Sequence, residues 1–251
     1  WAEEGATGET FLTLNSLLTR EYVERHGIDP DDFFAFARNA HDNAATAPHA
    51  LLRKPVSKET YSASKTLAPF IRLFDACPVC DGAAAVVLSS NGVKGQDVLV
   101  ASTQTRTDSL SLRRRQDVLE LRALREASEA ALQEASLELK HVGVFEAHDA
   151  YSIMTALCLE SVGFAGPGQA CALAMAGETS RRGRVPISTF GGLKARGHPV
   201  GASGVYQVAE IAAQLTREAG ESQIPSQALR AGMAVSLGGA ATTVSVSLLS
   251  L

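Results

Sequence analysis

The sequence lacks the features that mark several classes of protein. Its 251 residues carry a formal net charge of −4 and contain no block of Lys and Arg, which argues against a nucleic-acid partner. No apolar run is long enough to cross a membrane, and no signal peptide is visible. No serine stands in a Gly-x-Ser-x-Gly turn, and no glycine-rich loop matches the patterns that bind ATP or a dinucleotide. With 45% hydrophobic residues, the composition predicts a globular, cytoplasmic protein.

Cysteine is scarce, with four residues in the chain: Cys77, Cys80, Cys158 and Cys171. The first two form a Cys-x-x-Cys pair, but a zinc or redox site needs a second pair or histidines close by in sequence, and neither is present. We therefore expect reduced thiols, no disulfide framework and no metal site.

Basic residues gather only in short runs, at 113–115 and 181–182. Such runs are usually solvated surface, and the alternative is contact with the phosphate of an anionic substrate. The sequence leaves both interpretations open.

Helical and strand patterns alternate along most of the chain. Apolar side chains recur at helical spacing over 10–26, 29–45, 117–136, 153–159 and 201–217. Short apolar runs predict strands over 83–89, 98–105, 142–146, 231–237 and 242–249, and the last two are joined by Gly238-Gly239, a hairpin signal. Residues 46–66 have the composition of a loop, and 187–189 are strand-like. The alternation predicts an α/β fold with a mixed sheet.

Residues 191–204 are the most informative stretch, because five glycines surround a single histidine, His198, followed by proline. Glycine allows backbone to approach other backbone or a ligand closely. An ionisable ring in such a loop, just before a helix, suits proton transfer or oxyanion binding. The alternative is a tight strand-to-helix turn with a histidine on its rim.

A second histidine, His148, follows the strand predicted over 142–146. Ligands of open α/β sheets gather beyond the carboxyl ends of strands, so two imidazoles there could meet in one pocket. Together with the backbone N–H groups of the Gly238-Gly239 turn, they would suit a developing enolate or oxyanion. The alternative is that His148 caps the following helix or packs in the core. For Asp149 we expect a capping or structural role.

These motifs, taken together, resemble the thiolase superfamily, and within it the sterol-carrier-protein-type (SCP-x-like) thiolases. Residues 191–204 resemble the Gly-His-Pro motif with its flanking glycines, and 148–151 resemble the His-Asp-Ala/Cys-Phe motif of this branch. Residues 75–88 resemble the strand that returns from the thiolase loop domain, and 52–56 resemble the loop-domain segment before it. Residues 236–240 stand in the place of the C-terminal Cys-x-Gly motif.

The resemblance implies a layered αβαβα thiolase fold, represented here by a loop domain, part of the N-terminal sheet and the complete C-terminal half. The expected division is a helical loop domain over 1–77, remaining strands of the N-terminal half over 78–116, and the C-terminal thiolase domain over 117–251. The substrate implied is an acyl or 3-oxoacyl thioester of coenzyme A, with no covalently bound cofactor.

The resemblance also assigns roles to individual positions. His198 matches the histidine that activates the nucleophilic cysteine and lines the first oxyanion hole, and His148 matches the position that completes this hole. Gly238 matches a backbone donor of the second oxyanion hole. Cys77 falls where the family's pantetheine-contacting serine lies. The positions expected to contact coenzyme A are Cys77, Gly197, Ser236 and Gly239.

Two departures from the family pattern stand out. Nothing in the sequence resembles the segment that bears the nucleophilic cysteine, so several strands of the first sheet should be missing and an apolar sheet edge exposed. Another chain, or more of a longer protein, would supply them. Ser236 replaces the acid/base cysteine of ordinary thiolases, and Ala150 replaces the cysteine of some SCP-x-like members. A serine hydroxyl is a poor general base at neutral pH.

Three functions therefore stay open. The first is a thiolase-type acyltransferase acting on acyl-CoA. The second is a retro-aldol lyase acting on a β-hydroxyacyl-CoA, of the steroid side-chain type, beside a zinc-containing OB-fold partner. In that case Tyr151 or Tyr206 would serve as acid/base, unless these rings only pack. The third is a non-catalytic subunit. In each case we expect a homodimer or a hetero-oligomer.

Overall fold

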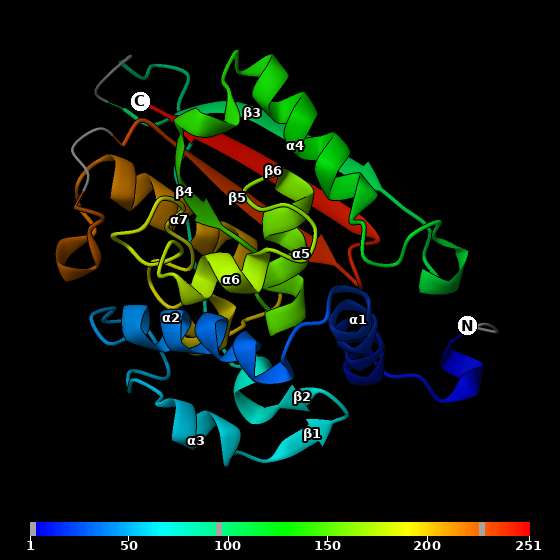
Figure 1. Ribbon diagram of the computed structural model, residues 1–251. Coiled ribbons are helices and arrows are strands. Elements are labelled where there is room, and N and C mark those ends of the chain that lie inside the picture. The colour runs from blue at the N-terminus through cyan, green and yellow to red at the C-terminus, as the bar shows by residue number, and fades with distance from the viewer. Residues whose placement is uncertain (1–3, 94–96, 226–228) are drawn as a thin grey trace.

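The computed structural model describes residues 4–93, 97–225 and 229–251 and is built around one mixed sheet (Figure 1). Its strand order is β3-β6-β5-β4. The two pairs that contain β6 are antiparallel, and β4 runs parallel to β5. The strands are β3 (Leu99–Thr107), β4 (Val142–Glu146), β5 (Ala231–Gly238) and β6 (Thr243–Ser250). The predicted α/β fold with a mixed sheet is confirmed.

Strands β5 and β6 form the predicted hairpin, which closes where Gly238 pairs with Thr243. Gly239 has a φ of +60°, a conformation that glycine adopts without steric cost. Successive side chains of β5 point to opposite faces of the sheet, because side chains alternate along a strand. Met233 and Val235 join the large core cluster, and Ala234 joins the cluster on the other face.

Helices cover both faces of the sheet. The larger core lies under α4 (Arg122–Glu134) and α5 (Ser152–Val162), and the smaller core lies under α7 (Ser203–Leu215). Helix α5 is apolar on all sides and buried, as expected of a helix enclosed by other elements. Helix α7 begins at the end of the glycine-rich stretch 191–204, which we call the glycine loop. The helix packs on β4 and β5, so it connects this loop to the sheet.

The N-terminal third is helical and packs below the sheet domain in Figure 1. Its elements are α1 (Phe11–His26), α2 (Phe34–Ala44), α3 (Lys58–Ser62) and the small hairpin β1 (Thr66–Ala68) and β2 (Ile71–Arg72). Helix α2 packs on α6 (Ala170–Met175) and on a π-helical turn over Gly192–Arg196. The short 3-10 helices are Gly5–Thr7, Pro30–Phe33, Leu73–Asp75, Leu112–Arg114, Leu139–His141 and Gly220–Ser222.

The strand predicted over 83–89 is wrong for the described chain, because these residues form no regular structure. A strand needs a neighbour for its ladder of hydrogen bonds, and none of the described strands lies beside this segment. Its side chains are exposed instead, Val87 at 95% and Leu88 at 76%.

Three smaller expectations also need correction. The helix predicted from 117 begins only at Arg122, because the Asp117 side chain accepts a hydrogen bond from the Leu119 N–H and holds a turn. The expected loop over 46–66 contains α3, whose N-cap is Ser57. The strand-like residues before the glycine loop make only one bridge, from Ile187 to Phe145.

The division into three units stays a prediction, and residues 1–3, 94–96 and 226–228 of those units lie outside the described residues. Strand β3, which falls in the predicted middle unit, pairs along its length with β6. Among the helices of the described chain, none is long and apolar enough to span a membrane.

Candidate active site

The two histidines singled out in the sequence meet in the structure. His148 follows the end of β4, and His198 lies between the π-helical turn and α7. Their ring centroids are 5.2 Å apart, with the ring planes at 86°, an edge-to-face arrangement. Two strand-to-helix junctions that are distant in sequence thus present their imidazoles at one place.

The glycine loop is held against the His148 segment by Asp149. One carboxylate oxygen of Asp149 accepts a hydrogen bond from the Leu193 N–H (2.6 Å), and the other accepts one from Ser188 Oγ (3.1 Å). A Cβ at Gly192 would lie 2.3 Å from Asp149 Oδ2, so only glycine lets the loop come this close. Asp149 is therefore a structural acid, which joins the two histidine-bearing segments.

The protonation of the His198 ring follows from its hydrogen bond to Ser203. The distance from His198 Nδ1 to Ser203 Oγ is 2.7 Å, and the Ser203 hydroxyl also contacts the Pro199 carbonyl oxygen at 3.1 Å. A carbonyl oxygen can only accept, so the serine proton goes to Pro199 and Nδ1–H of His198 donates to Ser203. In the neutral ring, Nε2 is then the unprotonated nitrogen.

Both imidazoles are held in the neutral form. Burial lowers the pKa of His148 well below its usual value, and the neighbouring His198 and Arg196 lower it further. The pKa of His198 is also lowered by burial and by Arg196, although Asp149 opposes this shift. The Nδ1 atom of His148 is buried and has no hydrogen-bond partner among the described residues.

The segment over 76–80 runs between the two histidine loops. The Cys77 N–H donates to the Ala150 carbonyl at 2.9 Å, and the His198 N–H donates to the Pro78 carbonyl at 2.9 Å. On the side of the His198 loop, Cys80 packs closely against Gly197. A Cβ added to Gly197 would lie 2.7 Å from the Cys80 Sγ atom. Burial raises the pKa of the Cys77 thiol to about 11, so Cys77 stays protonated at neutral pH.

The structure separates the two tyrosines that were candidates for acid/base work. Tyr151 follows directly after the His148 segment, packs edge-on against Phe11 with centroids 5.6 Å apart, and pairs with Ala76 in an isolated bridge. Burial and the Cys77 sulfur raise the pKa of its phenol. The Tyr206 ring instead lies under the Arg196 guanidinium, in a different cluster of side chains. The guanidinium carbon is 4.6 Å from the centroid of the Tyr206 ring.

The residues expected at the second oxyanion hole lie at the hairpin end of the sheet. Gly238 and Gly239 are exposed, and Ser236 is half-buried in β5. Ser236 Oγ lies 3.4 Å from the point that a Cβ on Gly204 would occupy, at the start of α7. Within the described residues, no hydrogen bond joins these residues to the two imidazoles.

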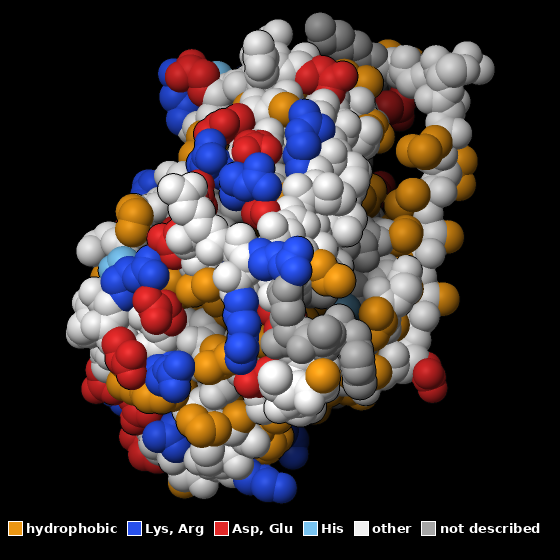
Figure 2. All heavy atoms as spheres, turned by 90° about the vertical axis from the view of Figure 1, so that its right-hand side faces the viewer, with side chains coloured by type: hydrophobic (Ala, Val, Ile, Leu, Met, Phe, Trp, Pro, Cys, Tyr) orange, Lys and Arg blue, Asp and Glu red, His pale blue; other side chains and the backbone are white. Residues whose placement is uncertain are grey.

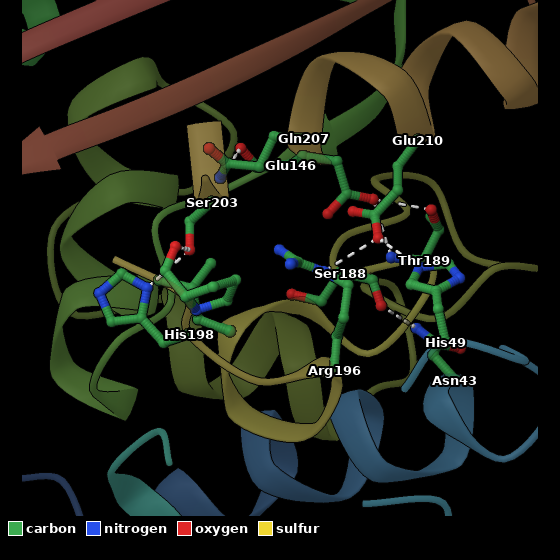
Figure 3. A network of polar contacts seen from close by, with 12 residues as sticks. Asn43, His49, Glu146, Ser188, Thr189, Arg196, His198, Ser203, Gln207 and Glu210 are labelled. Atoms are coloured by element: carbon green, nitrogen blue, oxygen red, sulfur yellow. Dashed lines mark hydrogen bonds and ion pairs between the residues drawn. The ribbon is translucent and has the colours of Figure 1, made fainter. Parts of the chain in front are cut away.

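Helix α7 carries a stripe of buried polar side chains that is not among the site residues predicted from the sequence. Its members are buried and spaced three or four residues apart: Ser203, Gln207, Glu210 and Gln214. Gln207 Nε2 lies 2.9–3.0 Å from the carbonyl oxygens of Glu146, Ala147 and Val235, which precede His148 and Ser236 in the chain (Figure 3). Polar residues at helical spacing were the signal that could have revealed this stripe.

A second part of the stripe holds the loop before His198. Arg196 Nε lies 2.9 Å from Glu210 Oε1, and the same oxygen lies 3.1 Å from His49 Nε2. Both Arg196 and Glu210 are buried, and in Figure 3 their contact lies near the middle of the network, apart from the His198 ring. Helix α7 thus holds the glycine loop through the contact of Glu210 with Arg196, and it holds the His198 ring through Ser203.

The last acid of β4, Glu146, is completely buried beside this network. Its Oε1 accepts hydrogen bonds from the Thr189 N–H (2.8 Å) and hydroxyl (2.7 Å). Burial and the nearby Glu210 carboxylate raise its pKa. Through its bonds to Thr189, Glu146 ties the end of β4 to the strand-like segment before the glycine loop.

A hollow of about 300 Å³ lies beside the glycine loop, lined among others by His49, Cys80, Arg196, Pro199 and Tyr206. Taken over residues 4–93, 97–225 and 229–251, no three His, Cys, Asp or Glu side chains are grouped so that they could hold a metal ion. The imidazole pair itself offers two neutral rings, one with an unprotonated Nε2 and one with an unpartnered ring nitrogen. Such a pair can accept a proton and donate to a developing oxyanion.

Comparison with known proteins shows which family the chain is similar to. The family model described as "Thiolase C-terminal domain-like" matches residues 104–251. An acetyl-CoA acetyltransferase of Methanothermobacter thermautotrophicus is 32% identical over 251 residues, which cover 98% of this chain and 65% of that protein. Sterol carrier protein 2 of Oryctolagus cuniculus is 28% identical over 231 residues, which cover 88% of this chain and 42% of that protein.

Solved structures show the same fold at low sequence identity. The Ltp2-ChsH2(DUF35) aldolase superposes with a TM-score of 0.83 at 17% identity, over 96% of this chain and 63% of that chain. A monomeric SCP2-thiolase like protein type 1 from Mycobacterium smegmatis gives a TM-score of 0.68 at 17% identity, over 94% of this chain and 50% of that one. The chain thus spans between 42% and 65% of the length of the two curated relatives above.

Proposed function

Because the chain belongs to the thiolase superfamily, we propose that it makes or breaks a carbon–carbon bond in an acyl-CoA thioester, by thiolytic cleavage or Claisen condensation. The observation that carries the proposal is the edge-to-face pair of neutral imidazoles, His148 and His198. Coenzyme A thioester enters as substrate, and no covalently bound cofactor is required.

The chemistry explains why two neutral rings suit the reaction. Cleavage and condensation both pass through a thioester enolate, whose negative charge develops on the thioester oxygen. We assign to His148 a hydrogen bond donated to this oxygen. We assign to His198 Nε2 the acceptance of a proton, since its Nδ1 proton is held by Ser203. Gly238 as a backbone donor stays a prediction, as do the coenzyme A contacts of Cys77, Gly197, Ser236 and Gly239.

A thiolytic mechanism also needs a nucleophilic cysteine, and three of the four cysteines do not suit this role. Burial raises the pKa of Cys77 to about 11 and that of Cys158 to about 12, and it raises the pKa of Cys171 as well. A thiol acts as a nucleophile only as the thiolate, so these groups are unreactive at neutral pH. The acyltransferase proposal therefore requires either Cys80, the remaining cysteine, or a cysteine supplied by another chain or another part of a longer protein.

The second candidate function is a retro-aldol lyase acting on a β-hydroxyacyl-CoA. It is favoured by Ser236, which replaces the acid/base cysteine, and it needs no acyl-enzyme. His198 Nε2 would take the proton of the β-hydroxyl while the Cα–Cβ bond breaks, giving a carbonyl product and a thioester enolate. Tyr151, whose raised pKa keeps the phenol protonated, would then donate a proton to the enolate carbon.

The two functions separate on the variant Tyr151→Phe. In a lyase, removal of the phenol proton donor is expected to lower turnover of a β-hydroxyacyl-CoA by about 100-fold. In an acyltransferase, thiolysis of a 3-oxoacyl-CoA should change little, because the Phe11 ring contact is kept. Steady-state rates with both substrate types measure the difference. The matched control is Tyr206→Phe, which keeps the ring under Arg196, and full lyase activity of Tyr151→Phe would exclude the lyase assignment.

We also propose that a second chain, or another part of a longer protein, covers the segment 81–90. Apolar side chains on it are exposed, and its backbone makes no hydrogen bond to other backbone among the described residues. Figure 2 shows hydrophobic side chains gathered along a narrow segment that stands off the body of the molecule. A homodimer or a hetero-oligomer would meet this need, and a zinc-containing OB-fold partner is the form that we propose for a lyase.

The variant Val87→Asp tests this partner surface. Val87 is 95% exposed, so a charge there should leave the thermal midpoint of the isolated chain unchanged and should reduce assembly at least about tenfold, because it buries an unpaired carboxylate in the contact. Native mass spectrometry of the purified particle measures assembly. Leu110→Asp, at a loop position 74% exposed, is the matched control. Unchanged assembly of Val87→Asp would contradict the proposal.

A further inference from the structure

A large hollow lies at the opposite end of the sheet from the two imidazoles. Its volume is about 1170 Å³, and it is bounded by the starts of β3 and β5, the end of β6 and the residues before β4. His148 follows the other end of β4, a five-residue strand that spans roughly 16 Å. A ligand in this hollow would not occupy the site proposed for the acyl-CoA chemistry.

The charge of the hollow is opposite to that of the chain. Five cationic side chains line it: Lys140, Arg181, Arg182, Arg184 and Arg230. Glu134 is the one acidic side chain among the described lining residues, and its carboxylate already accepts hydrogen bonds from Ser102 and Gln104. In a chain with a net charge of −4, such a group of cations favours an anionic ligand.

Several of these cations are available to a ligand. Arg182 and Arg230 are exposed, and their guanidinium groups have no hydrogen-bond or ion-pair partner among the described residues. Arg181 is half-buried and held in place, since its Nη1 donates to Thr46 Oγ1 (2.9 Å) and to the Glu221 carbonyl (3.0 Å). The basic run at 181–182, left open by the sequence, thus lies on the wall of a hollow.

The remaining lining is mostly apolar, with His141 and Ser250 as further polar side chains. Ile224 and Leu229 are buried in its floor, and Leu99 and Leu137 lie at its wall. A Cβ on Gly143 would lie 2.5 Å from Leu229 Cδ1, so this glycine lets Leu229 pack closely on β4. No Phe, Tyr or Trp lines the hollow within the described chain, which disfavours a nucleobase, because bases are usually held by aromatic stacking.

We propose that this hollow binds an aliphatic carboxylate, with its head group on Arg182 and Arg230 and its hydrocarbon chain over Leu99 and Leu229. Guanidinium groups match carboxylate geometry and form charge-assisted hydrogen bonds with it. The volume exceeds the range of about 300–1,000 Å³ that is typical of small-molecule sites, so a medium-length chain has room. This proposal is independent of the acyl-CoA chemistry.

Isothermal titration calorimetry of the purified protein with decanoate, below its micelle concentration, tests the proposal. We expect saturable binding that weakens at least about tenfold in Arg182→Glu and in Arg230→Glu, and that is unchanged in Arg113→Glu, an exposed arginine outside the hollow. Leu99→Ser, at an exposed position, should weaken decanoate and leave acetate unchanged.

Three outcomes would overturn the proposal. The first is the lack of saturable decanoate binding. The second is equal binding by the wild type and the two charge-reversed variants. The third is adenosine 3′,5′-bisphosphate binding more tightly than decanoate and displacing it, which would identify the hollow as a nucleotide site. Circular dichroism of each variant confirms that it is folded.

Discussion

Replacement of His198 by alanine is expected to lower the rate of carbon–carbon bond formation or cleavage by about 10²–10⁴-fold in the native particle. The reason is that Nε2 of this ring is the unprotonated nitrogen of the imidazole pair, because Nδ1–H is held by Ser203. Neither function proposed here proceeds without a proton acceptor at this place. Steady-state rates with a 3-oxoacyl-CoA and with a β-hydroxyacyl-CoA measure the loss.

The control for this variant is His141→Ala. His141 is exposed and lies before β4, at the other end of the sheet, so its removal should leave turnover unchanged. Full activity of His198→Ala in the assembled particle would mean that the chain is a non-catalytic subunit. That result would remove both enzymatic proposals together.

The variant Gln207→Leu is expected to lower the free energy of unfolding by about 1–3 kcal/mol. Gln207 is 1% exposed, and its amide lies within hydrogen-bond distance of the carbonyl oxygens of Glu146, Ala147 and Val235. Leucine removes the amide donor from all three carbonyls, although the Ala147 carbonyl keeps a hydrogen bond from the Asp149 N–H. A buried carbonyl left without any donor costs about 1–3 kcal/mol. Urea unfolding followed by circular dichroism gives the difference.

Gln133→Leu is the matched control, because Gln133 is an exposed residue of α4. Surface substitutions of this kind usually change stability by less than about 0.5 kcal/mol. If Gln207→Leu unfolds at the same urea concentration as the wild type, then the polar stripe of α7 does not hold the end of β4, and the rigid placement of His148 needs another explanation.

Local sequence signals were sufficient where an element is stabilised by its own neighbours. The β5–β6 hairpin was predicted because its two apolar strands are joined directly by Gly238-Gly239. The helices around Leu18 and Leu124 were predicted because their apolar residues recur at helical spacing. The same signals failed over 83–89, because a strand also needs a partner for its backbone, and the described chain provides none there.

The candidate site was predicted in part. The strand-to-helix position of His148 and His198 was visible in sequence, and the structure brings the two rings together. The contacts that orient them were not visible, because Ser203 and Gln207 act across elements that only the tertiary fold brings into contact. The separation of Tyr206 from Tyr151 likewise depends on which side of α7 faces Arg196.

The central claim is that the imidazole pair stabilises the enolate of a coenzyme A thioester. The most direct test is the exchange of α-protons for deuterium in acetyl-CoA or propionyl-CoA in heavy water, followed by NMR on the native particle. This exchange reports enolate formation whether the protein is an acyltransferase or a lyase. We predict incorporation by the wild type and its loss in His198→Ala. Equal incorporation by both proteins, or none by the wild type, would contradict the account.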